Sequence, residues 1–370
     1  MIEYLESRIV YENPRPHVHS RHGYFPGLVH LGGGELLCLF VRSEAFESPD
    51  ATTWIARSRD LGRSWTLERP LYDKRAVGFE TSDSFKATRL RDGSLVAMGY
   101  RFHRHDPEQG IALEETGGIL PGDVVVTFSR DQGCTWETPA VVPRSRPELY
   151  EVSGPCVETS SGALLAVGAL FELPDGTNPS GQCGVLLRSL DGGRTWDDRT
   201  VYFRAPLGNL TPFEGRLCEM QSGRLVALVW AFDYAAGRHH ANHLAFSHDD
   251  GQTWSAPIDT GNPGQASSLL YAGGDRLLTI HAHRGSDPGI YVRVVDFSRG
   301  EWRPVEELNL FGANLSQTRE GMSMREMFSS LRFGQSSLLH LEGDEYLATH
   351  WSVEDGQGKI RSHRLRIRPR

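Results

Sequence analysis

Four stretches of the chain are nearly the same octapeptide: SRDLGRSW (residues 58–65), SRDQGCTW (129–136), SLDGGRTW (189–196) and SHDDGQTW (247–254). Their first residues lie 71, 60 and 58 residues apart. This period is too long for a solenoid of single hairpins and fits one four-stranded sheet per repeat. The repeats therefore predict a β-propeller in which each octapeptide marks one blade.

The residues of these octapeptides suit a tight turn. Their aspartate can accept hydrogen bonds from backbone amides, their glycine can adopt a positive φ, and their serine or threonine can add a second local bond. The tryptophan then begins the next strand and buries a large ring. Because such a turn fixes strand register without any ligand, we expect the aspartates to be structural rather than catalytic.

Length and composition are typical of one closed all-β domain that spans residues 1–370. The chain holds 40 glycines and 20 prolines, as expected for many short strands joined by tight turns. Its 39% of hydrophobic residues supply a sizeable core. No linker rich in proline, glycine or serine and no block of charge divides the chain. Closed all-β folds commonly exceed the usual domain length, so one domain is expected.

The formal net charge of −8 argues against nucleic acid and anionic membranes as partners, because both attract basic proteins. The first 17 residues are too polar and acidic for the apolar core of a secretory signal, which predicts a cytoplasmic protein. The five cysteines form no C-x-x-C pair and are expected to be free thiols. None of these features indicates an oligomeric state.

A second pattern, a glycine-rich or acidic turn followed by an apolar strand, gives the number of blades. It occurs six times, at residues 31–40, 90–100, 158–170, 219–230, 271–283 and 341–351. Each occurrence is the turn and second strand of a hairpin, so six blades of four antiparallel strands are predicted, with almost no helix. Residues 3–11 are expected to pair with the last blade, since a propeller must cover its terminal edges.

In a propeller the first strand of each blade lines the central channel. Residues that precede this strand and residues that follow the second strand therefore meet at one end of the axis. This rule selects the candidate catalytic residues Glu151, Glu214, His103 and His283. It also selects the candidate substrate-binding residues Tyr24, Arg42, Lys86, Arg101, Arg104, Trp230, Arg284, Gln335, His350 and Trp351. The segment 101–123 exceeds the length of a hairpin and either covers the channel or forms a solvated excursion.

The signature S-x-D-x-G-x-T-W resembles the Asp box of the sialidase (neuraminidase) superfamily, the bacterial neuraminidase-like (BNR) repeat. The resemblance covers four blades and implies a sialidase-like propeller. Sialidases clamp a carboxylate with three arginines and use an aspartate as acid and a tyrosine nucleophile assisted by a glutamate. In this chain Arg42 matches a position of the family in blade one, Asp50 stands where the acid is expected, and Glu214 matches the assisting glutamate.

Other positions depart from the family pattern. Tyr24 stands where the first clamping arginine is expected, and the run 229–234 replaces a further arginine. Gln335 occupies the nucleophile position, and a glutamine amide cannot replace a phenolate. The resemblance therefore implies a sialidase-like protein without ordinary sialidase activity.

Basic residues are frequent in the candidate site although the whole chain is acidic. A positive funnel would suit an anionic sugar, such as a uronate or a ligand like sialic acid. It would be formed by Arg42, Lys86, Arg101, His103, Arg104, His283 and Arg284. The alternative is that several of these residues pair at the rim with Glu80, Asp83 and Glu151.

Two kinds of acid–base chemistry remain open. Two carboxyl groups could hydrolyse a glycosidic bond, and the candidates are Asp50, Glu151 and Glu214. A histidine base with an arginine that neutralises a uronate would serve β-elimination as well as hydrolysis. The candidates for that base are His103, His283 and His350.

Three pairs of histidines are spaced so that both rings leave one face of an extended strand. They are His17 with His19, His103 with His105, and His281 with His283. No carboxylate spacing completes a metal-binding motif, and histidine is common in sugar sites. The sequence therefore predicts no cofactor, with a bound divalent metal as the alternative.

Together these features predict a carbohydrate-active enzyme whose substrate is an oligosaccharide or glycan. The first hypothesis is an exo-acting glycoside hydrolase for an acidic or rhamnose/uronate-type oligosaccharide. The second is a polysaccharide lyase on the same propeller, metal-assisted or not. The third is a glycan-binding propeller without catalytic activity. Aromatic side chains near the channel mouth would stack on sugars in all three cases.

Overall fold

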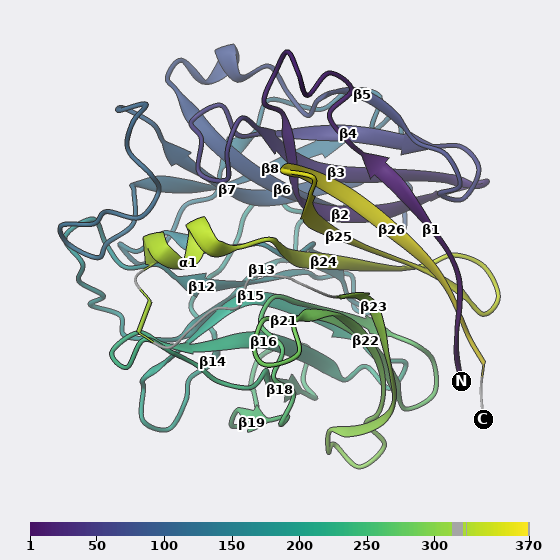
Figure 1. Ribbon diagram of the computed structural model, residues 1–370. Coiled ribbons are helices and arrows are strands. Elements are labelled where there is room, and N and C mark those ends of the chain that lie inside the picture. The colour runs from purple at the N-terminus through teal and green to yellow at the C-terminus, as the bar shows by residue number, and fades with distance from the viewer. Residues whose placement is uncertain (313–320, 323, 369–370) are drawn as a thin grey trace.

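Six antiparallel sheets surround a central axis in the computed structural model, which describes residues 1–312, 321–322 and 324–368 (Figure 1). Blade one contains β2 (His22–Gly32), β3 (Glu35–Ser43), β4 (Thr52–Ser58) and β5 (Thr66–Pro70). Blade two contains β6 (Thr81–Arg89), β7 (Leu95–His103), β8 (Gly122–Ser129) and β9 (Ala140–Val141). Blade three contains β10 (Tyr150–Glu151), β11 (Val157–Glu158), β12 (Leu164–Leu170), β13 (Gly184–Ser189) and β14 (Val201–Phe203).

The other three blades follow the same order from the axis outward. Blade four contains β15 (Leu210–Glu219), β16 (Leu225–Asp233), β17 (Arg238–His239), β18 (His243–Ser247) and β19 (Ile258–Asp259). Blade five contains β20 (Ser267–Tyr271), β21 (Arg276–His283), β22 (Gly289–Asp296) and β23 (Arg303–Gly312). Blade six contains β24 (Phe333–His340), β25 (Glu345–Glu354), β26 (Gln357–Ile367) and, at its outer edge, β1 (Ile2–Tyr11). The predicted all-β, six-bladed propeller is confirmed.

The N-terminal strand closes the ring. It pairs with β26 from Ile2 opposite Ile367 to Tyr11 opposite Ile360, so the first and last segments of the chain share one blade. Figure 1 shows the two termini side by side, at the end of the ring away from the helix α1 (Met324–Ser330). Besides α1, the described residues contain one short 3-10 helix, Lys74–Val77.

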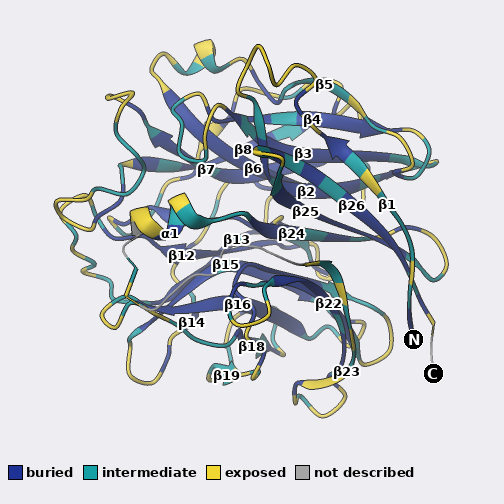
Figure 2. Ribbon diagram, in the orientation of Figure 1, coloured by how far each residue is buried: buried dark blue, intermediate teal, exposed yellow. Residues whose placement is uncertain are grey.

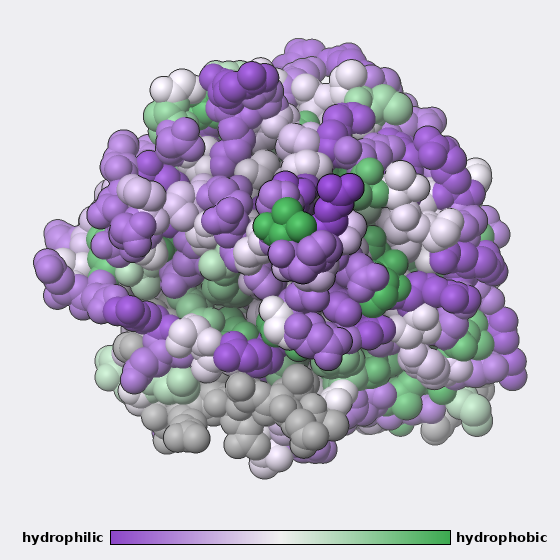
Figure 3. Space-filling view, turned by 45° about the horizontal axis from the view of Figure 1, so that its top comes forward, coloured by the Kyte–Doolittle hydropathy of each residue, from purple (hydrophilic) through white to green (hydrophobic). Residues whose placement is uncertain are grey.

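The core lies between neighbouring blades. The second strands are apolar on both faces; in β3, for example, the five residues 36–40 are completely buried. Leu37 and Leu39 of blade one share a cluster with Phe85 and Leu95 of blade two, because adjacent sheets pack face to face. Figure 2 shows these strands as buried and the connections as exposed, and the surface in Figure 3 is largely hydrophilic with smaller hydrophobic areas.

The Asp boxes are turns between the third and fourth strands of blades one to four. In the second box, Asp131 accepts hydrogen bonds from the hydroxyl of Ser129 (2.8 Å) and from the amide and hydroxyl of Thr135 (2.8 and 2.6 Å). The bonds from Thr135 lower the pKa of Asp131 to about 2. Gly133 has a φ of +79°, and a Cβ there would lie 2.6 Å from Leu37 of the preceding blade. The box therefore holds its own turn and lets two blades approach closely.

Candidate functional site

A cavity opens at the end of the axis where the inner strands begin and the second strands end. All six blades contribute side chains to it. Its volume is about 120 Å³, several times the roughly 10–15 Å³ that one water molecule needs. The Asp boxes follow the third strands and lie at the opposite end of the blades. The end of the channel that the strand-order rule selects from the sequence is the end at which this cavity lies.

β-Bulges aim three residues at the axis from equivalent inner strands. The pairing register shifts between Tyr24 and Gly27 in β2, between Phe213 and Arg216 in β15, and at Gln335 in β24. A bulge inserts a residue and redirects its side chain. Phe213 and Glu214 accordingly both line the cavity, although they are consecutive in the chain.

Two of these bulges require an uncommon backbone conformation. Phe25 has a φ of +53° and Glu214 a φ of +50°, and residues other than glycine seldom adopt such positive values. The glycines that follow have no room for a side chain: a Cβ at Gly27 would lie 2.5 Å from Cδ of Lys86, and one at Gly215 would lie 2.8 Å from the hydroxyl of Tyr202. Strain of this kind persists only where the surrounding structure enforces it, and it is concentrated at functional sites.

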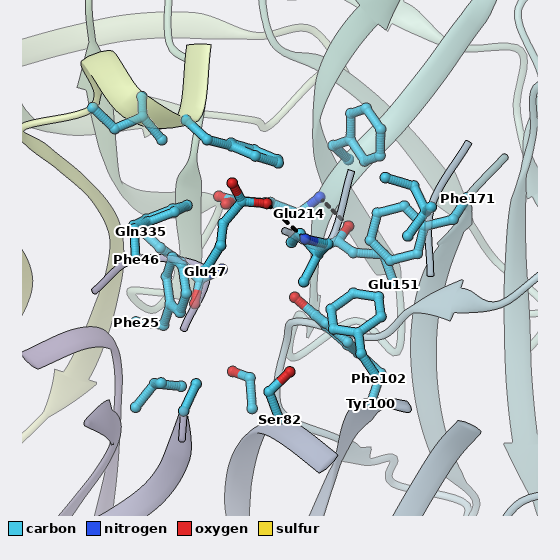
Figure 4. Close-up of a pocket in the computed structure, with 18 of the residues that line it drawn as sticks. Phe25, Phe46, Glu47, Ser82, Tyr100, Phe102, Glu151, Phe171, Glu214 and Gln335 are labelled. Atoms are coloured by element: carbon cyan, nitrogen blue, oxygen red, sulfur yellow. Dashed lines mark hydrogen bonds between the residues drawn. The ribbon is translucent and has the colours of Figure 1, made fainter. Parts of the chain in front are cut away.

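Aromatic rings form most of the cavity wall. Figure 4 shows Phe25, Phe46 and Gln335 on one side and Tyr100, Phe102 and Phe171 on the other. Phe25 and Phe46 pack edge to face at 5.3 Å between ring centroids. The remaining aromatic residues of the wall are Phe213, Trp230, Phe232, Phe328 and Trp351.

Two segments outside the blades cover the cavity. Ile111 and Ile119 come from the long connection between β7 and β8, and Met327 and Phe328 come from α1. Of the two roles that the sequence leaves open for that connection, the structure shows the covering one. The cover, like the walls, is therefore largely hydrophobic.

Two carboxyl groups from neighbouring blades lie together in this apolar cavity. Glu151 of β10 is buried, and its Oε2 accepts a hydrogen bond of 2.7 Å from the backbone amide of Glu214 in β15. Burial and the nearby charge of Glu214 raise the pKa of Glu151 well above that of a free carboxyl. Because a buried carboxyl close to another acidic group does not ionise readily, Glu151 retains its proton near neutral pH.

Two buried cations, Lys86 and Arg216, lie behind the cavity wall. Lys86 is buried, makes a long hydrogen bond to the hydroxyl of Ser84 (3.4 Å), and has a pKa lowered to about 7 by burial and by Arg216. Arg216 donates to the hydroxyl of Ser153 (3.1 Å) and to the carbonyl of Glu214 (3.0 Å). Both cations also interact electrostatically with the Glu151–Glu214 pair, so they stabilise negative charge on it.

A third carboxyl group reaches the cavity from the loop between β3 and β4. Glu47 lines the cavity, its Oε1 accepts a hydrogen bond from the amide of Ile111 (3.0 Å), and burial raises its pKa. The sequence resemblance selects Asp50 in this loop instead. The structure turns Asp50 away from the cavity, where its Oδ1 accepts a hydrogen bond from the amide of Glu44 (3.1 Å). A shift of three residues inside an irregular loop is not readable from strand periodicity.

Six of the residues selected from the sequence line the cavity: Glu151, Glu214, Trp230, Arg284, Gln335 and Trp351. Arg284 is fully engaged in the wall, since it donates to the carbonyl of Phe333 (2.7 and 3.1 Å) and to Oε1 of Gln265 (2.6 Å). Lys86 lies beneath the cavity. Tyr24 packs behind the wall, with its ring centroid 5.2 Å from that of Trp351.

The structure does not bring the other selected cations to the cavity. Arg101 and His103 both bind Asp123, each at 3.0 Å. Arg104 donates to the carbonyls of Glu47 (2.8 Å) and Gln109 (2.7 Å). The predicted positive funnel does not form, because each of these groups has a partner within or beside its own blade.

The remaining selected residues lie elsewhere in their blades. Arg42 lies over the ring of Trp54 on the outer side of blade one. His283 packs against Tyr291 at 6.1 Å. His350 is completely buried, and its Nε2 lies 3.0 Å from Nε2 of His363. None of the three histidines considered as a base lines the cavity.

The histidine pairs considered for a metal lie in different parts of the ring, His103 and His105 at the end of blade two and His281 and His283 in blade five. The rings of His103 and His105 are 6.4 Å apart, while His281 and His283 both contact Tyr291. Within the described ranges, no three side chains of His, Cys, Asp or Glu are grouped so that they could hold a metal ion. In the same part of the chain, no helix combines the length and hydrophobicity needed to span a membrane.

Comparison with known proteins agrees with this architecture. Residues 121–316 match the family described as the BNR repeat-like domain. This match covers more than half of the chain, so the protein belongs to the BNR repeat-like domain family. The fold is the sialidase-type propeller that the Asp boxes imply. A comparison with curated protein sequences found no match.

Several solved structures are similar over nearly the whole chain. A crystal structure of a protein of unknown function from Dyadobacter fermentans DSM 18053 has a TM-score of 0.80 and 21% identity over 99% of both chains. The Hadza microbial sialidase Hz136 has a TM-score of 0.67 and 17% identity over 94% of this chain and 66% of its own. NanB sialidase from Streptococcus pneumoniae, as its K499G mutant, has a TM-score of 0.65 and 11% identity over 97% and 70%. At these identities the likeness establishes the fold alone.

Proposed function

We propose that this protein is an exo-acting glycoside hydrolase that removes a terminal neutral sugar of rhamnose type from an oligosaccharide. The observation that carries this proposal is the Glu151–Glu214 carboxyl pair at the base of a covered, aromatic-lined cavity. Most glycoside hydrolases cleave the glycosidic bond with two carboxyl groups in different environments, one as the acid and the other as the base or nucleophile. The sialidase-type propeller supports a saccharide as the ligand class.

The cavity wall suits a sugar ring. Aromatic rings stack on the apolar C–H faces of sugars, and they supply most of this wall. Four residues of the wall also carry buried polar atoms without a hydrogen-bond partner among the described residues: Ser82 Oγ, Glu214 Oε2, Gln335 Oε1 and Trp351 Nε1. Buried polar atoms are normally satisfied, so hydroxyl groups of a bound ligand are suitable partners for these four.

The charges of the cavity favour a neutral sugar over an acidic one. Glu47, Glu151 and Glu214 all line it, whereas the one cation of the described lining, Arg284, is already bound to protein oxygens. A carboxylate on the ligand would enter a desolvated site without a free cation and next to glutamates, which costs free energy. A 6-deoxy sugar replaces a polar group with a methyl, which fits the apolar wall.

The two glutamates have different tasks in this mechanism. Glu151 holds a proton at neutral pH and donates it to the glycosidic oxygen as the bond to the anomeric carbon breaks. Glu214 supplies negative charge beside the anomeric carbon, either as the base that activates water or as the nucleophile. Gln335 can donate or accept hydrogen bonds to the sugar but cannot attack it.

A screen with reducing-end-labelled oligosaccharides tests this function. Substrates would end in L-rhamnose, in a neutral hexose or in a uronate, and products would be identified by mass spectrometry. We expect release of the terminal neutral sugar by the wild-type protein and loss of release in Glu214→Gln. Glu80→Gln, which changes an exposed glutamate just before β6, is the matched control and should keep activity.

Two outcomes would overturn the proposal. An unsaturated uronate product, detected by its ultraviolet absorbance, would indicate a lyase, a chemistry for which no described histidine lines the cavity. A raised melting temperature with oligosaccharides but no product from any of them would indicate a binding protein without catalysis.

A further inference from the structure

A second groove lies on the outer side of blade one. It is lined by residues 19–21 and 42–44, by β4 and β5, and by residues 134–136 of the second Asp box. Its volume is about 780 Å³, compared with about 120 Å³ for the axial cavity, so it has room for more than one sugar ring. A single loop separates the two spaces: Phe46 and Glu47 face the cavity, while Glu44 and Asp50 face the groove.

Two arginines of this groove, Arg42 and Arg21, form no ion pair within the described part of the chain. The guanidinium of Arg42 lies 3.9 Å above the ring of Trp54. Neither Arg42 nor Arg21 makes a side-chain hydrogen bond or an ion pair with any residue that the structure describes. Arg75 in the same groove differs, because it is bound to Asp73 at 2.7 Å. The groove therefore offers two uncommitted guanidinium groups in a chain of net charge −8.

These two arginines are close enough to affect each other. Burial, the largest influence, and the charge of Arg21 both lower the pKa of Arg42, and Tyr11 and Asp50 oppose them. Asp50 forms no ion pair with either arginine among the described residues, and its Oδ1 accepts a hydrogen bond from the amide of Glu44 instead. The two guanidinium groups outnumber the one carboxylate that acts on Arg42, so an anionic ligand would relieve the repulsion between them.

The stacking on Trp54 prepares Arg42 for a particular kind of ligand. An arginine held over an aromatic ring loses less side-chain freedom on binding than an unrestrained one. The planar guanidinium matches the two oxygens of a carboxylate or a sulfate in a bidentate arrangement. A nearby second guanidinium can bind the same group.

We propose that this groove is a second binding site, for the oxyanion group of a saccharide, either a uronate carboxylate or a sulfate ester. Arg42 and Arg21 bind the oxyanion, and the volume of the groove accommodates the sugar that carries it. Binding here uses none of the cavity residues, so the inference stands apart from the proposed hydrolysis.

Isothermal titration calorimetry tests the site with three probes: trigalacturonate, the neutral maltotriose and sodium sulfate. We expect trigalacturonate to bind, maltotriose not to bind at the groove, and sulfate to bind at least tenfold more weakly than trigalacturonate. Arg42→Gln and Arg21→Gln should each weaken trigalacturonate binding tenfold or more, and higher ionic strength should weaken it further. Arg199→Gln is the matched control, because Arg199 is exposed and bound to Asp197 on another blade.

Two more variants make the result independent of folding defects. Asp50→Asn removes a competing negative charge and should tighten trigalacturonate binding, which a damaged protein would not do. Glu214→Gln should leave this binding unchanged, so a failure of the proposed hydrolysis and a failure of the groove can be told apart. Equal binding by wild type, Arg42→Gln and Arg21→Gln would overturn the proposal. Sulfate affinity equal to that of trigalacturonate would also overturn it, since the groove would then hold only a free anion.

Discussion

Replacement of the buried lysine beneath the cavity, Lys86→Met, should stabilise the protein in a pH-dependent manner. Lys86 is 3% exposed, and its ammonium has one long hydrogen bond to a hydroxyl. Displacement of its pKa from 10.5 to about 7 corresponds to about 5 kcal/mol of unfavourable free energy for the charged form. Methionine has a similar length and fills irregular apolar space well.

The sign of the effect follows from the folded and unfolded pKa values. Below pH 7 the lysine is charged in both states, so the folded protein bears the full cost of the buried charge. As the pH rises towards 10.5, the unfolded lysine also loses its proton and the cost disappears. The gain from Lys86→Met should therefore be largest near pH 6 and vanish near pH 10.5.

The expected gain is smaller than the full cost. The displaced pKa of Lys86 already contains the attraction of its ammonium to Glu151 and Glu214, and the methionine must still pack in the space that the lysine leaves. Replacement of buried ionic groups by apolar ones of similar volume commonly stabilises proteins by about 1–4 kcal/mol. We expect the free energy of unfolding to rise by about this amount at pH 6.

Urea denaturation followed by tryptophan fluorescence at several pH values measures this difference. Lys359→Met is the matched control, because Lys359 forms an ion pair with Glu12 (3.3 Å) and should give no comparable gain. A Lys86→Met variant that is less stable than wild type at pH 6 would refute the reasoning. A gain that does not change between pH 6 and pH 10 would also refute it.

Three further predictions concern the site and the scaffold. Activity should fall as the pH rises through the raised pKa of Glu151, because the acid loses its proton. A pH–rate profile of Glu151→Gln should show low activity without this decrease at alkaline pH. An unchanged profile would contradict the acid role. Asp131→Ala removes the three hydrogen bonds of one Asp box and should lower the free energy of unfolding by about 1–3 kcal/mol in chemical denaturation. Substrate specificity should not change. Unchanged stability would contradict the structural role. Gly27→Ala places a methyl 2.5 Å from Cδ of Lys86 and should cost about 1–3 kcal/mol of stability, measured in the same way; a stabilised variant would contradict the close approach.

The architecture and the location of the cavity are predictable from the sequence because they depend on repeats and strand order. The Asp boxes give the blade period, and the strand-order rule places Glu151 and Glu214 at one end of the axis. These two residues are found without knowledge of the bulge that aims Glu214 inward.

The partners of side chains are much less predictable. Arg101 lies opposite Asp123 in the β7–β8 pairing, a register set by a long connection whose path the sequence does not reveal. Glu47 and Asp50 share one irregular loop, and its backbone decides which of them faces the cavity. Phe328, which covers the cavity, belongs to the short helix α1, and no periodic pattern in the sequence predicts this helix.

The dependence of the rate on the leaving group tests the central claim most directly. A dinitrophenyl glycoside needs no proton on its leaving oxygen, whereas an unactivated glycoside of the same sugar does. If Glu151 is the acid, Glu151→Gln should lose about 10²–10⁴-fold in kcat/KM on the unactivated substrate and much less on the dinitrophenyl glycoside. Glu214→Gln should lose activity on both. Equal losses on the two substrates in Glu151→Gln, or full activity on both, would contradict the account.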